Sequence, residues 1–269
     1  MIKKKILITG ATSGLGKYLA GQARQRHELI ILGRNMNKME EYFPDSARYR
    51  ADLSSISEVK KAAEQISEEN EHLDLLICNA GMLGAESFTK TPEGIEQTLA
   101  VNYLSHYILL ATLWGKLTPG SSKVIMIGSA SAAWYPVNFS DPESEQDYRP
   151  LKAYGRSKAM LMMLGKWIYD EWGQAGPIPY IVDPGTFSSG IARSRARWFQ
   201  FIYGLASWAM SGVENAGSEV INLIEGANYP PGKIIKKGKV KDLVFSREEI
   251  SNLMHMSRTL TGCDLNRMR

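Results

Sequence analysis

The sequence predicts an α/β fold in which helices cover both faces of a doubly wound parallel sheet. Short apolar runs alternate with longer amphipathic stretches along the chain, and the first apolar run ends in a glycine-rich turn at residues 9–16. Strands that alternate with helices form βαβ units, and the right-handed crossovers of such units place helices on both sides of the sheet. Because no linker, repeat or low-complexity segment interrupts this pattern, we expect residues 1–269 to form one domain.

Each predicted element follows from its local pattern. Residues 73–78 read Leu-Asp-Leu-Leu-Ile-Cys, a nearly continuous apolar run that is typical of a parallel strand buried on both faces. With this run at 73–78, similar apolar runs predict further strands at 6–9, 28–32, 47–51, 123–127 and 180–182. Amphipathic stretches predict helices at 14–26, 37–43, 55–70, 93–116 and 154–172, and a further helix at 247–262 with methionine and leucine on one face.

The chain has 269 residues and a net charge of +4, and the basic excess lies late in the sequence. Residues 1–191 carry 20 basic and 21 acidic side chains, a net of −1. Residues 192–211 add three arginines and no acid, and residues 230–269 carry nine basic and four acidic side chains. An excess this small and local is a weak signal for nucleic-acid binding, so we expect no nucleic-acid partner.

Several other classes of protein are also disfavoured. The two cysteines, Cys78 and Cys263, are too few for a disulfide framework and lack the spacing of a zinc site. The four histidines form no HExxH pair, so we expect no metal site. No apolar run reaches the ~18 residues of a membrane span. We therefore expect a cytoplasmic protein in reduced form.

The glycine-rich turn joins the first predicted strand to the first predicted helix. Gly10 allows a tight exit from the strand, Gly14 lets the backbone approach a pyrophosphate, and Gly16 lets the helix pack close to the sheet. The helix N-terminus offers free N–H groups and partial positive charge to phosphates. The alternative is a glycine turn without a ligand, but its place in the first βα turn favours a dinucleotide in a Rossmann-type fold. We expect the cofactor to contact Gly10, Thr12, Ser13, Gly14, Leu15 and Gly16.

Arg34, at the end of the second predicted strand, bears on the choice of cofactor. An NAD site usually carries an acidic residue here that binds the ribose 2′-hydroxyl, whereas this sequence has a cation. A guanidinium suits a 2′-phosphate through charge-assisted contacts, and Lys17 and Lys38 are candidates to assist it. The alternative is that Arg34 begins a solvated helix. We therefore expect NADP(H) and disfavour NAD(H).

Polar residues follow the third and fourth predicted strands, at the sheet edge where ligands bind in such folds. Asp52 and Leu53 follow the third strand. Asp52 is a candidate acceptor for the adenine amino group, and equally a cap for the helix that begins near residues 54–55. Asn79, Ala80 and Gly81 follow the fourth strand. For Asn79 we leave two interpretations open, which are a tie between neighbouring strands and a cofactor contact.

Tyr154 and Lys158 open the predicted helix after the fifth strand and share one helix face. A phenol is a poor acid at neutral pH, with an ordinary pKa of about 10, and a neighbouring ammonium favours the phenolate. The same lysine can hold a nicotinamide ribose with its other donors. A Tyr-x-x-x-Lys pair alone is often an ordinary helix pair, so its significance depends on its neighbours.

Two further polar positions complete the candidate constellation. Ser129 ends the fifth strand, and its hydroxyl is placed to donate to a carbonyl oxygen and to stabilise a developing alkoxide. Ser131 is a rival, and we prefer Ser129 because it lies nearer the strand end. Asn102 lies within a predicted helix, where it is either solvated or holds a water in a proton path.

Taken in their order along the chain, these motifs resemble those of the short-chain dehydrogenase/reductase family. The resemblance covers nearly the whole chain. The family pattern is TGxxxGxG, then NAG, then Asn, Ser and YxxxK, and this chain matches it at 9–16, at 79–81 and at the four positions just described. The resemblance implies a catalytic tetrad of Asn102, Ser129, Tyr154 and Lys158. Tyr154 would be the general acid, Ser129 would orient the carbonyl, Lys158 would lower the tyrosine pKa and hold the ribose, and Asn102 would support a water leading to Lys158. Pro184, Gly185 and Ser189 match the family's turn that contacts the nicotinamide.

Two features indicate a branch of that family. A long stretch of 24 residues separates Ser129 from Tyr154, and the chain ends with the predicted helix at 247–262. Both resemble retinol dehydrogenase-like and protochlorophyllide reductase-like members. Gly128 departs from the second serine that many members carry, at a position that is not expected to do chemistry.

The substrate side is expected to be apolar. In this fold the segment after the Pro184–Gly185 turn usually covers the substrate, and residues 187–211 combine three arginines with several aromatics. The alternatives are a basic amphipathic helix on an anionic membrane surface, which would make a peripheral membrane contact, and a helix packed on the body. The C-terminal extension is expected at 230–269. The predicted pocket residues are Ser131, Trp134, Tyr135, Phe187 and Trp198.

We therefore predict an NADP(H)-dependent carbonyl reductase or alcohol dehydrogenase. Its substrate is expected to be a small molecule, namely a hydrophobic carbonyl compound or alcohol of medium size. One alternative is a reductase of an activated C=C bond. Another is a catalytically silent NADP(H)-binding regulator. A homo-oligomer is compatible with the sequence.

Overall fold

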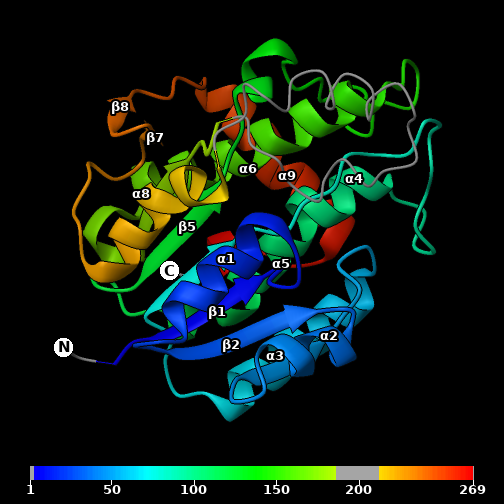
Figure 1. The fold of residues 1–269 in the computed structure, drawn as a ribbon. Helices are drawn as coiled ribbons and strands as arrows, with labels where there is room; N and C mark the ends of the chain where they lie inside the picture. Colours follow the sequence, from blue (N-terminus) through cyan, green and yellow to red (C-terminus); the bar gives the residue numbers. More distant parts are fainter. Residues whose placement is uncertain (1–2, 186–211, 269) are drawn as a thin grey trace.

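A computed structural model describes residues 3–185 and 212–268, which form one eight-stranded sheet with helices on both faces (Figure 1). The strand order is β3-β2-β1-β4-β5-β6-β7-β8. The pairs from β3 to β7 are all parallel, and β8 is antiparallel to β7. The strands are β1 (Lys5–Thr9), β2 (Glu28–Gly33), β3 (Ala47–Arg50), β4 (Leu75–Cys78), β5 (Lys123–Ile127), β6 (Ile178–Val182), β7 (Ile234–Lys236) and β8 (Lys239–Lys241). This confirms the predicted α/β, Rossmann-type doubly wound sheet.

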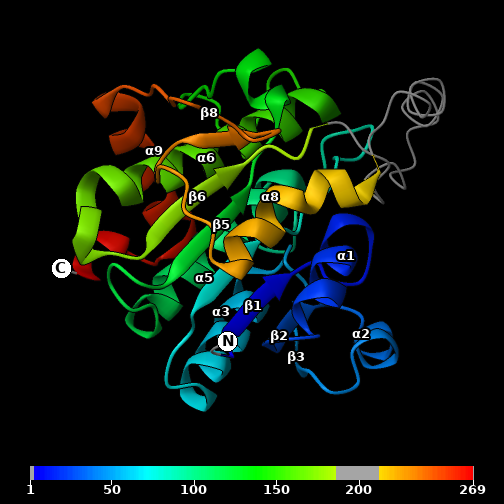
Figure 2. The same ribbon diagram turned by 60° about the vertical axis from the view of Figure 1, so that its left-hand side comes forward.

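The helices divide into two layers (Figures 1 and 2). One face of the sheet packs against α1 (Gly14–Ala23), α2 (Met36–Tyr42) and α8 (Val213–Glu225). The other face packs against α3 (Ile56–Glu69), α5 (Ser105–Leu113), α6 (Pro150–Trp172) and α9 (Arg247–Thr261). Short helices complete the described chain, namely α4 (Gln97–Leu99), η1 (Ala100–Leu104), η2 (Trp114–Lys116), η3 (Ala130–Trp134), η4 (Gly173–Ala175) and η7 (Leu265–Met268). Within the described ranges, no helix is both long and apolar enough to cross a bilayer.

The expected helix at 93–116 is wrong in its start and in its regularity. The helical stretch begins at Gln97, because the buried Glu96 carboxylate accepts hydrogen bonds from the backbone N–H groups of Thr98 and Leu99 at 2.8 and 2.6 Å. It then winds as a π-helical turn over η1 before becoming α-helical in α5. The other predicted helices and strands are present, with ends that shift by a few residues. For example, α6 begins four residues earlier than expected, with Pro150 at its first turn.

The C-terminal part of the chain adds elements that the sequence pattern did not reveal. Helix α8 and the hairpin β7–β8 were not predicted, whereas α9 confirms the helix expected at 247–262. Strand β7 extends the parallel sheet beyond β6, and β8 closes its edge with Lys239 and Lys241. Lysines on an edge strand discourage pairing with another sheet. Helix α9 begins with a capping box of Ser246 and Glu249.

The strand order reverses between β1 and β4, because β2 and β3 lie on one side of β1 and β4 to β7 on the other. In open α/β sheets, ligands bind at the carboxyl ends of the strands at this switch point. Register pairs Ile8 of β1 with Ile77 of β4, and Cys78 of β4 with Met126 of β5. The residues that follow β1, β4 and β5 therefore meet at one edge of the sheet.

Candidate active site

The glycine turn after β1 has the geometry that a phosphate cradle requires. Gly10 and Gly14 have φ angles of +72° and +50°, a region that favours glycine. A Cβ on Gly16 would meet Gly10 O and Asn79 Nδ2 and would lie 2.9 Å from Gly10 C, so no side chain fits there. Ser13 precedes α1 without a side-chain cap hydrogen bond within the described chain, which leaves the first N–H groups of the helix open to an anion. Thr12 and Leu15 belong to this same turn.

Asn79 ties the glycine turn to the end of β4. Its Nδ2 donates to Thr9 O at 2.8 Å and to Gly10 O at 3.5 Å. The Thr9 hydroxyl accepts from the backbone N–H groups of Asn79 and Ala80 at 3.1 and 3.0 Å. Of the two interpretations of Asn79, these contacts support the tie between strands.

Arg34 and Asp52 lie side by side at the ends of β2 and β3. The Arg34 side chain is 78% exposed, and its Nη1 lies 3.8 Å from Asp52 Oδ2. Arg34 precedes α2, which is capped by Asn35, so it does not begin that helix as the alternative supposed. Nor does Asp52 cap α3, because Ser55 does so, while Asp52 Oδ1 accepts from the Ser54 N–H and hydroxyl.

Of the two lysines expected to assist Arg34, Lys17 is placed less favourably for phosphate binding. Lys17 Nζ lies 3.3 Å from the centroid of the Tyr42 ring, a cation–π contact, so this ammonium is directed at α2. Lys38 donates its backbone N–H to Asn35 Oδ1 within the α2 cap. Leu53 is half-buried beside Asp52. Arg34 and the exposed Lys38 are therefore the cations at this corner on which a 2′-phosphate contact would depend.

Lys158 is buried beneath the strand ends. Only 2% of it is exposed, and its Nζ donates to Ile127 O, at the end of β5, at 2.8 Å. Burial lowers the pKa of Lys158 to about 8, and the nearby Cys78 opposes that shift. Lys158 Nζ lies 5.9 Å from the centroid of the Tyr154 ring, one helical turn away. A Cβ on Gly81 would lie 3.2 Å from Lys158 Nζ, which places the turn after β4 directly over the ammonium.

Ser129 is the N-cap residue of η3, and its Oγ lies 2.9 Å from Ser131 Oγ. Ser129 also accepts the backbone N–H of Ser131 at 3.3 Å. Ser131 is buried and Ser129 is half-buried. These positions favour Ser129 as the hydroxyl that a substrate reaches, with Ser131 behind it.

Asn102 is fully buried in the π-helical turn η1, so the solvated alternative is wrong. Its Oδ1 accepts the Met82 N–H at 2.8 Å, and its Nδ2 donates to Met82 O at 3.0 Å and to Ser157 Oγ at 2.9 Å. Both amide hydrogens are thereby used to clamp the turn after β4 against α6. π-Helical turns inside helices are frequent at functional sites.

The predicted pocket residues are only partly described. Trp134 is 65% exposed, an unusual position for an indole, and Tyr135 packs so closely on Gly155 that a Cβ there would lie 2.6 Å from Tyr135 Cδ2. Gly185 has a φ of +73°, and Pro184 beside it is half-buried. Ser189, Phe187, Trp198 and the rest of the predicted lid at 187–211 lie outside the described residues.

Asp183 begins the turn that was matched to the family pattern, and its contacts are among those near the site that sequence reasoning missed. Its Oδ1 accepts the Gly185 N–H at 2.9 Å, and its Oδ2 accepts from Lys236 of β7 at 2.7 Å. This ion pair fixes the Pro184–Gly185 turn to the C-terminal hairpin. An acid directly before that turn and a lysine in a distant short strand give no sequence pattern that would pair them.

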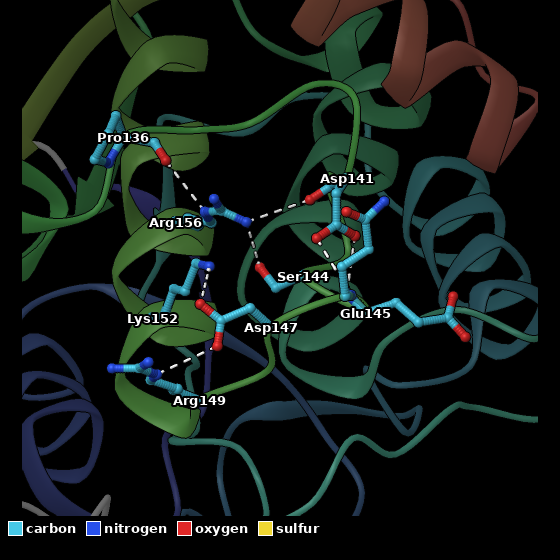
Figure 3. A network of polar contacts seen from close by, with 9 residues as sticks. Pro136, Asp141, Ser144, Glu145, Asp147, Arg149, Lys152 and Arg156 are labelled. Carbon is cyan, nitrogen blue, oxygen red and sulfur yellow. Dashed lines mark hydrogen bonds and ion pairs between the residues drawn. The ribbon is translucent and has the colours of Figure 1, made fainter.

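Arg156 is a second missed residue, and it fastens the long stretch between Ser129 and Tyr154 to α6 (Figure 3). Its Nε donates to Pro136 O at 3.1 Å, and its Nη1 donates to Asp141 O at 3.3 Å and to Ser144 Oγ at 2.8 Å. Ser144 is buried with a φ of +60°, a constrained conformation for a residue other than glycine. Arg156 therefore holds this stretch in place two residues from Tyr154.

A family model described as short chain dehydrogenase matches residues 4–199, which is more than half of the chain. The chain belongs to the short-chain dehydrogenase family. This confirms the resemblance on which the site was predicted, and the motif positions of this short-chain dehydrogenase all lie within the matched range.

The curated relatives of this short-chain dehydrogenase include several retinol dehydrogenases. Retinol dehydrogenase 14 of Mus musculus is 28% identical over 211 residues, which cover 71% of this chain and 63% of the relative. Retinol dehydrogenase 13 of Homo sapiens is 29% identical over 203 residues, which cover 71% of this chain and 61% of the relative. The chain thus matches less than two thirds of the length of these two relatives.

Solved structures show the same fold. An uncharacterized protein from Mycobacterium paratuberculosis matches with a TM-score of 0.74 at 20% identity, over 97% of this chain and 94% of that chain. A short-chain dehydrogenase from Sphingobium yanoikuyae in complex with NADPH matches with a TM-score of 0.63 at 22% identity, over 82% of this chain and 85% of that chain. At these identities the likeness concerns the fold.

Proposed function

We propose that this oxidoreductase uses NADP(H) to reduce the carbonyl group of a hydrophobic, medium-sized substrate, or to oxidise the corresponding alcohol. The observation that carries the proposal is the pairing of Tyr154 with the buried Lys158 at the strand ends, 5.9 Å from ring centroid to Nζ. Ser129 lies at the end of the adjacent β5. A proton donor, a cation that stabilises its conjugate base and a carbonyl-orienting hydroxyl are the groups that such a reduction needs.

The residues around the switch point fit a dinucleotide with a 2′-phosphate. The uncapped helix N-terminus suits the pyrophosphate, the absence of a side chain at Gly16 lets this helix pack against Gly10 and Asn79, and the exposed guanidinium of Arg34 suits the 2′-phosphate. When bound, NADPH supplies a hydride to the carbonyl carbon. The residues that would hold it are Gly10, Thr12, Ser13, Gly14, Leu15, Gly16, Arg34, Asp52, Leu53, Asn79, Ala80, Gly81, Tyr154, Lys158, Pro184, Gly185 and Ser189.

The side chains have distinct roles in this proposal. Ser129 donates a hydrogen bond to the carbonyl oxygen and holds it toward Tyr154. As that oxygen gains negative charge, the Tyr154 hydroxyl gives up its proton, and the ammonium of Lys158 stabilises the phenolate that remains. Asn102 keeps the turn after β4 and α6 in register, so that Gly81 lies over Lys158.

A retinoid-like alcohol or aldehyde is the substrate class that we propose to test first. The curated relatives named above are retinol dehydrogenases. The exposed indole of Trp134, five residues after Ser129 along the chain, offers an apolar surface to such a molecule. Steroid, quinone, aliphatic carbonyl and enone compounds complete the panel. Turnover of enones alone would instead support the reductase of an activated C=C bond.

The cofactor preference is tested by Arg34→Asp. The variant is expected to weaken NADPH use by at least about tenfold while improving NADH use, since it removes a charge-assisted contact and adds a repulsive charge. Lys61→Asp, an equal charge change on the exposed side of α3, serves as the control. Initial rates with both cofactors provide the measurement, and an unchanged preference would contradict the assignment. Binding of NADPH by the wild type without turnover of any panel member would favour the silent regulator.

A further inference from the structure

His106 lies in α5 behind the candidate site and is buried with both ring nitrogens engaged. Its Nδ1 lies 3.1 Å from the backbone oxygen of Asn102, and its Nε2 lies 3.0 Å from Thr9 Oγ1. Only 1% of the residue is exposed. Its contacts therefore run to two elements of the site, and the mechanism above does not use it.

The hydrogen-bond partners decide where the ring proton lies. The Asn102 carbonyl oxygen can only accept, so Nδ1 carries the hydrogen. Thr9 Oγ1 already accepts two backbone N–H groups, from Asn79 and Ala80. Its own hydrogen therefore points to a free acceptor, and Nε2 at 3.0 Å is closer than the other candidate, Ile77 O at 3.4 Å. His106 is thus neutral, with its hydrogen on Nδ1.

The neutral ring also suits the charge of its surroundings. The pKa of His106 is lowered to about 4, chiefly by burial and to a smaller extent by the positive charge of Lys158, while the bond to Asn102 opposes the shift. A protonated imidazole would repel the ammonium that Tyr154 depends on. Protonation would also place an N–H against a threonine oxygen whose acceptor positions are filled.

The two ends of the ring reach different parts of the site. Through Thr9, His106 contacts the residue that holds the backbone of Asn79 and Ala80 beside the glycine turn. Through the Asn102 backbone, it contacts the π-helical turn whose side chain clamps Met82 and Ser157. One imidazole therefore spans the cofactor turn and the segment that places Gly81 over Lys158.

We propose that His106 is a positioning residue that couples the glycine turn to the Asn102 segment of the active site. The contact with Thr9 positions the glycine turn that would hold the cofactor. The contact with Asn102 positions the segment that places Gly81 over Lys158. This inference rests on the proposed function for its catalytic half, whereas its cofactor half concerns NADPH binding alone.

Two substitutions separate the two contacts. In His106→Asn the carboxamide occupies the place of Nδ1, so it keeps a donor toward Asn102 and loses Thr9. In His106→Gln the carboxamide reaches the place of Nε2, so it keeps an acceptor for Thr9 and loses Asn102. We expect His106→Asn to weaken NADPH binding about 3- to 10-fold with kcat nearly unchanged, and His106→Gln to lower kcat about 3- to 10-fold with NADPH affinity nearly unchanged. His72→Gln, at an exposed histidine, is the control.

The tautomer is read directly from imidazole ¹⁵N shifts in the wild-type protein. The hydrogen is expected on Nδ1, without titration between pH 5.5 and 8. A hydrogen on Nε2, equal effects of both variants on affinity and kcat, or no effect of either would overturn the inference. The NADPH affinity and the ¹⁵N shifts can both be measured without turnover. A wild type that binds NADPH and reduces nothing would therefore refute the proposed function, while these two readings still decide the cofactor half.

Discussion

At the scale of single residues, the catalytic role that we propose for Lys158 opposes its contribution to stability. Its burial lowers its pKa from 10.5 to about 8, so the folded protein holds this proton less tightly than the unfolded chain does. Below pH 8 the buried ammonium lowers the free energy of unfolding. This loss is recovered as the pH rises from 8 toward 10.5, because the folded protein releases the proton first. In the proposed mechanism, the same positive charge is what Tyr154 requires to act as an acid at neutral pH.

We therefore expect Lys158→Met to abolish turnover and to stabilise the fold. Removing a buried charge with this shift is worth on the order of 1–3 kcal/mol at pH 7, part of which is offset by leaving Ile127 O without its donor. The free energy of unfolding, measured in urea at pH 7 and pH 9.5, should exceed that of the wild type more at pH 7. Lys166→Met, at a lysine paired with Asp170 on the surface of α6, should change it by less than about 0.5 kcal/mol. A less stable variant at both pH values would contradict the proposed cost of burial.

At the scale of elements, the stretch between η3 and α6 shows what a sequence pattern leaves open. The sequence predicts the length of this stretch and the helix that follows it. Its path depends on Arg156, whose partners are two backbone carbonyls and one hydroxyl (Figure 3). Backbone acceptors carry no residue-type signature, so this anchor had no signal in the sequence. The π-helical turn at Asn102 was likewise hidden, because its residues fit an ordinary apolar helix.

The anchor is tested by Arg156→Met. The change leaves the carbonyl oxygens of Pro136 and Asp141 and the Ser144 hydroxyl without their buried donor, so it should cost about 2–4 kcal/mol of stability. The stretch at 136–147 should also become the first site of cleavage in limited proteolysis. Arg149→Met removes an arginine whose side chain is 74% exposed, and it should leave both measurements nearly unchanged. Cleavage elsewhere first, with stability retained, would show that the stretch is held by other contacts.

At the scale of the whole molecule, the parallel sheet and the edge that carries the candidate site were predictable, whereas α8 and the hairpin β7–β8 were not. Buried strands that alternate with helices predict a doubly wound sheet. In such a sheet the carboxyl ends of β1, β4 and β5 lie at one edge, which brings the glycine turn, Asn79 and Ser129 together. The hairpin β7–β8 has strands of three residues, rich in lysine, without the apolar run that marks a strand. Its contact with the site passes through Lys236 and Asp183, which are 53 residues apart.

The measurement that tests the account most directly is a single turnover of enzyme-bound NADPH with an aldehyde of the retinoid class, followed by chromatography of quenched samples in the wild type and in Tyr154→Phe. The wild type is expected to consume NADPH at a rate that slows with deuterium at the transferred position. Tyr154→Phe is expected to bind NADPH with nearly the same affinity and to lose at least about 10²-fold in rate, since it lacks the proton donor. If Tyr154→Phe consumes NADPH as fast as the wild type, Tyr154 is not the general acid and the proposed mechanism is wrong.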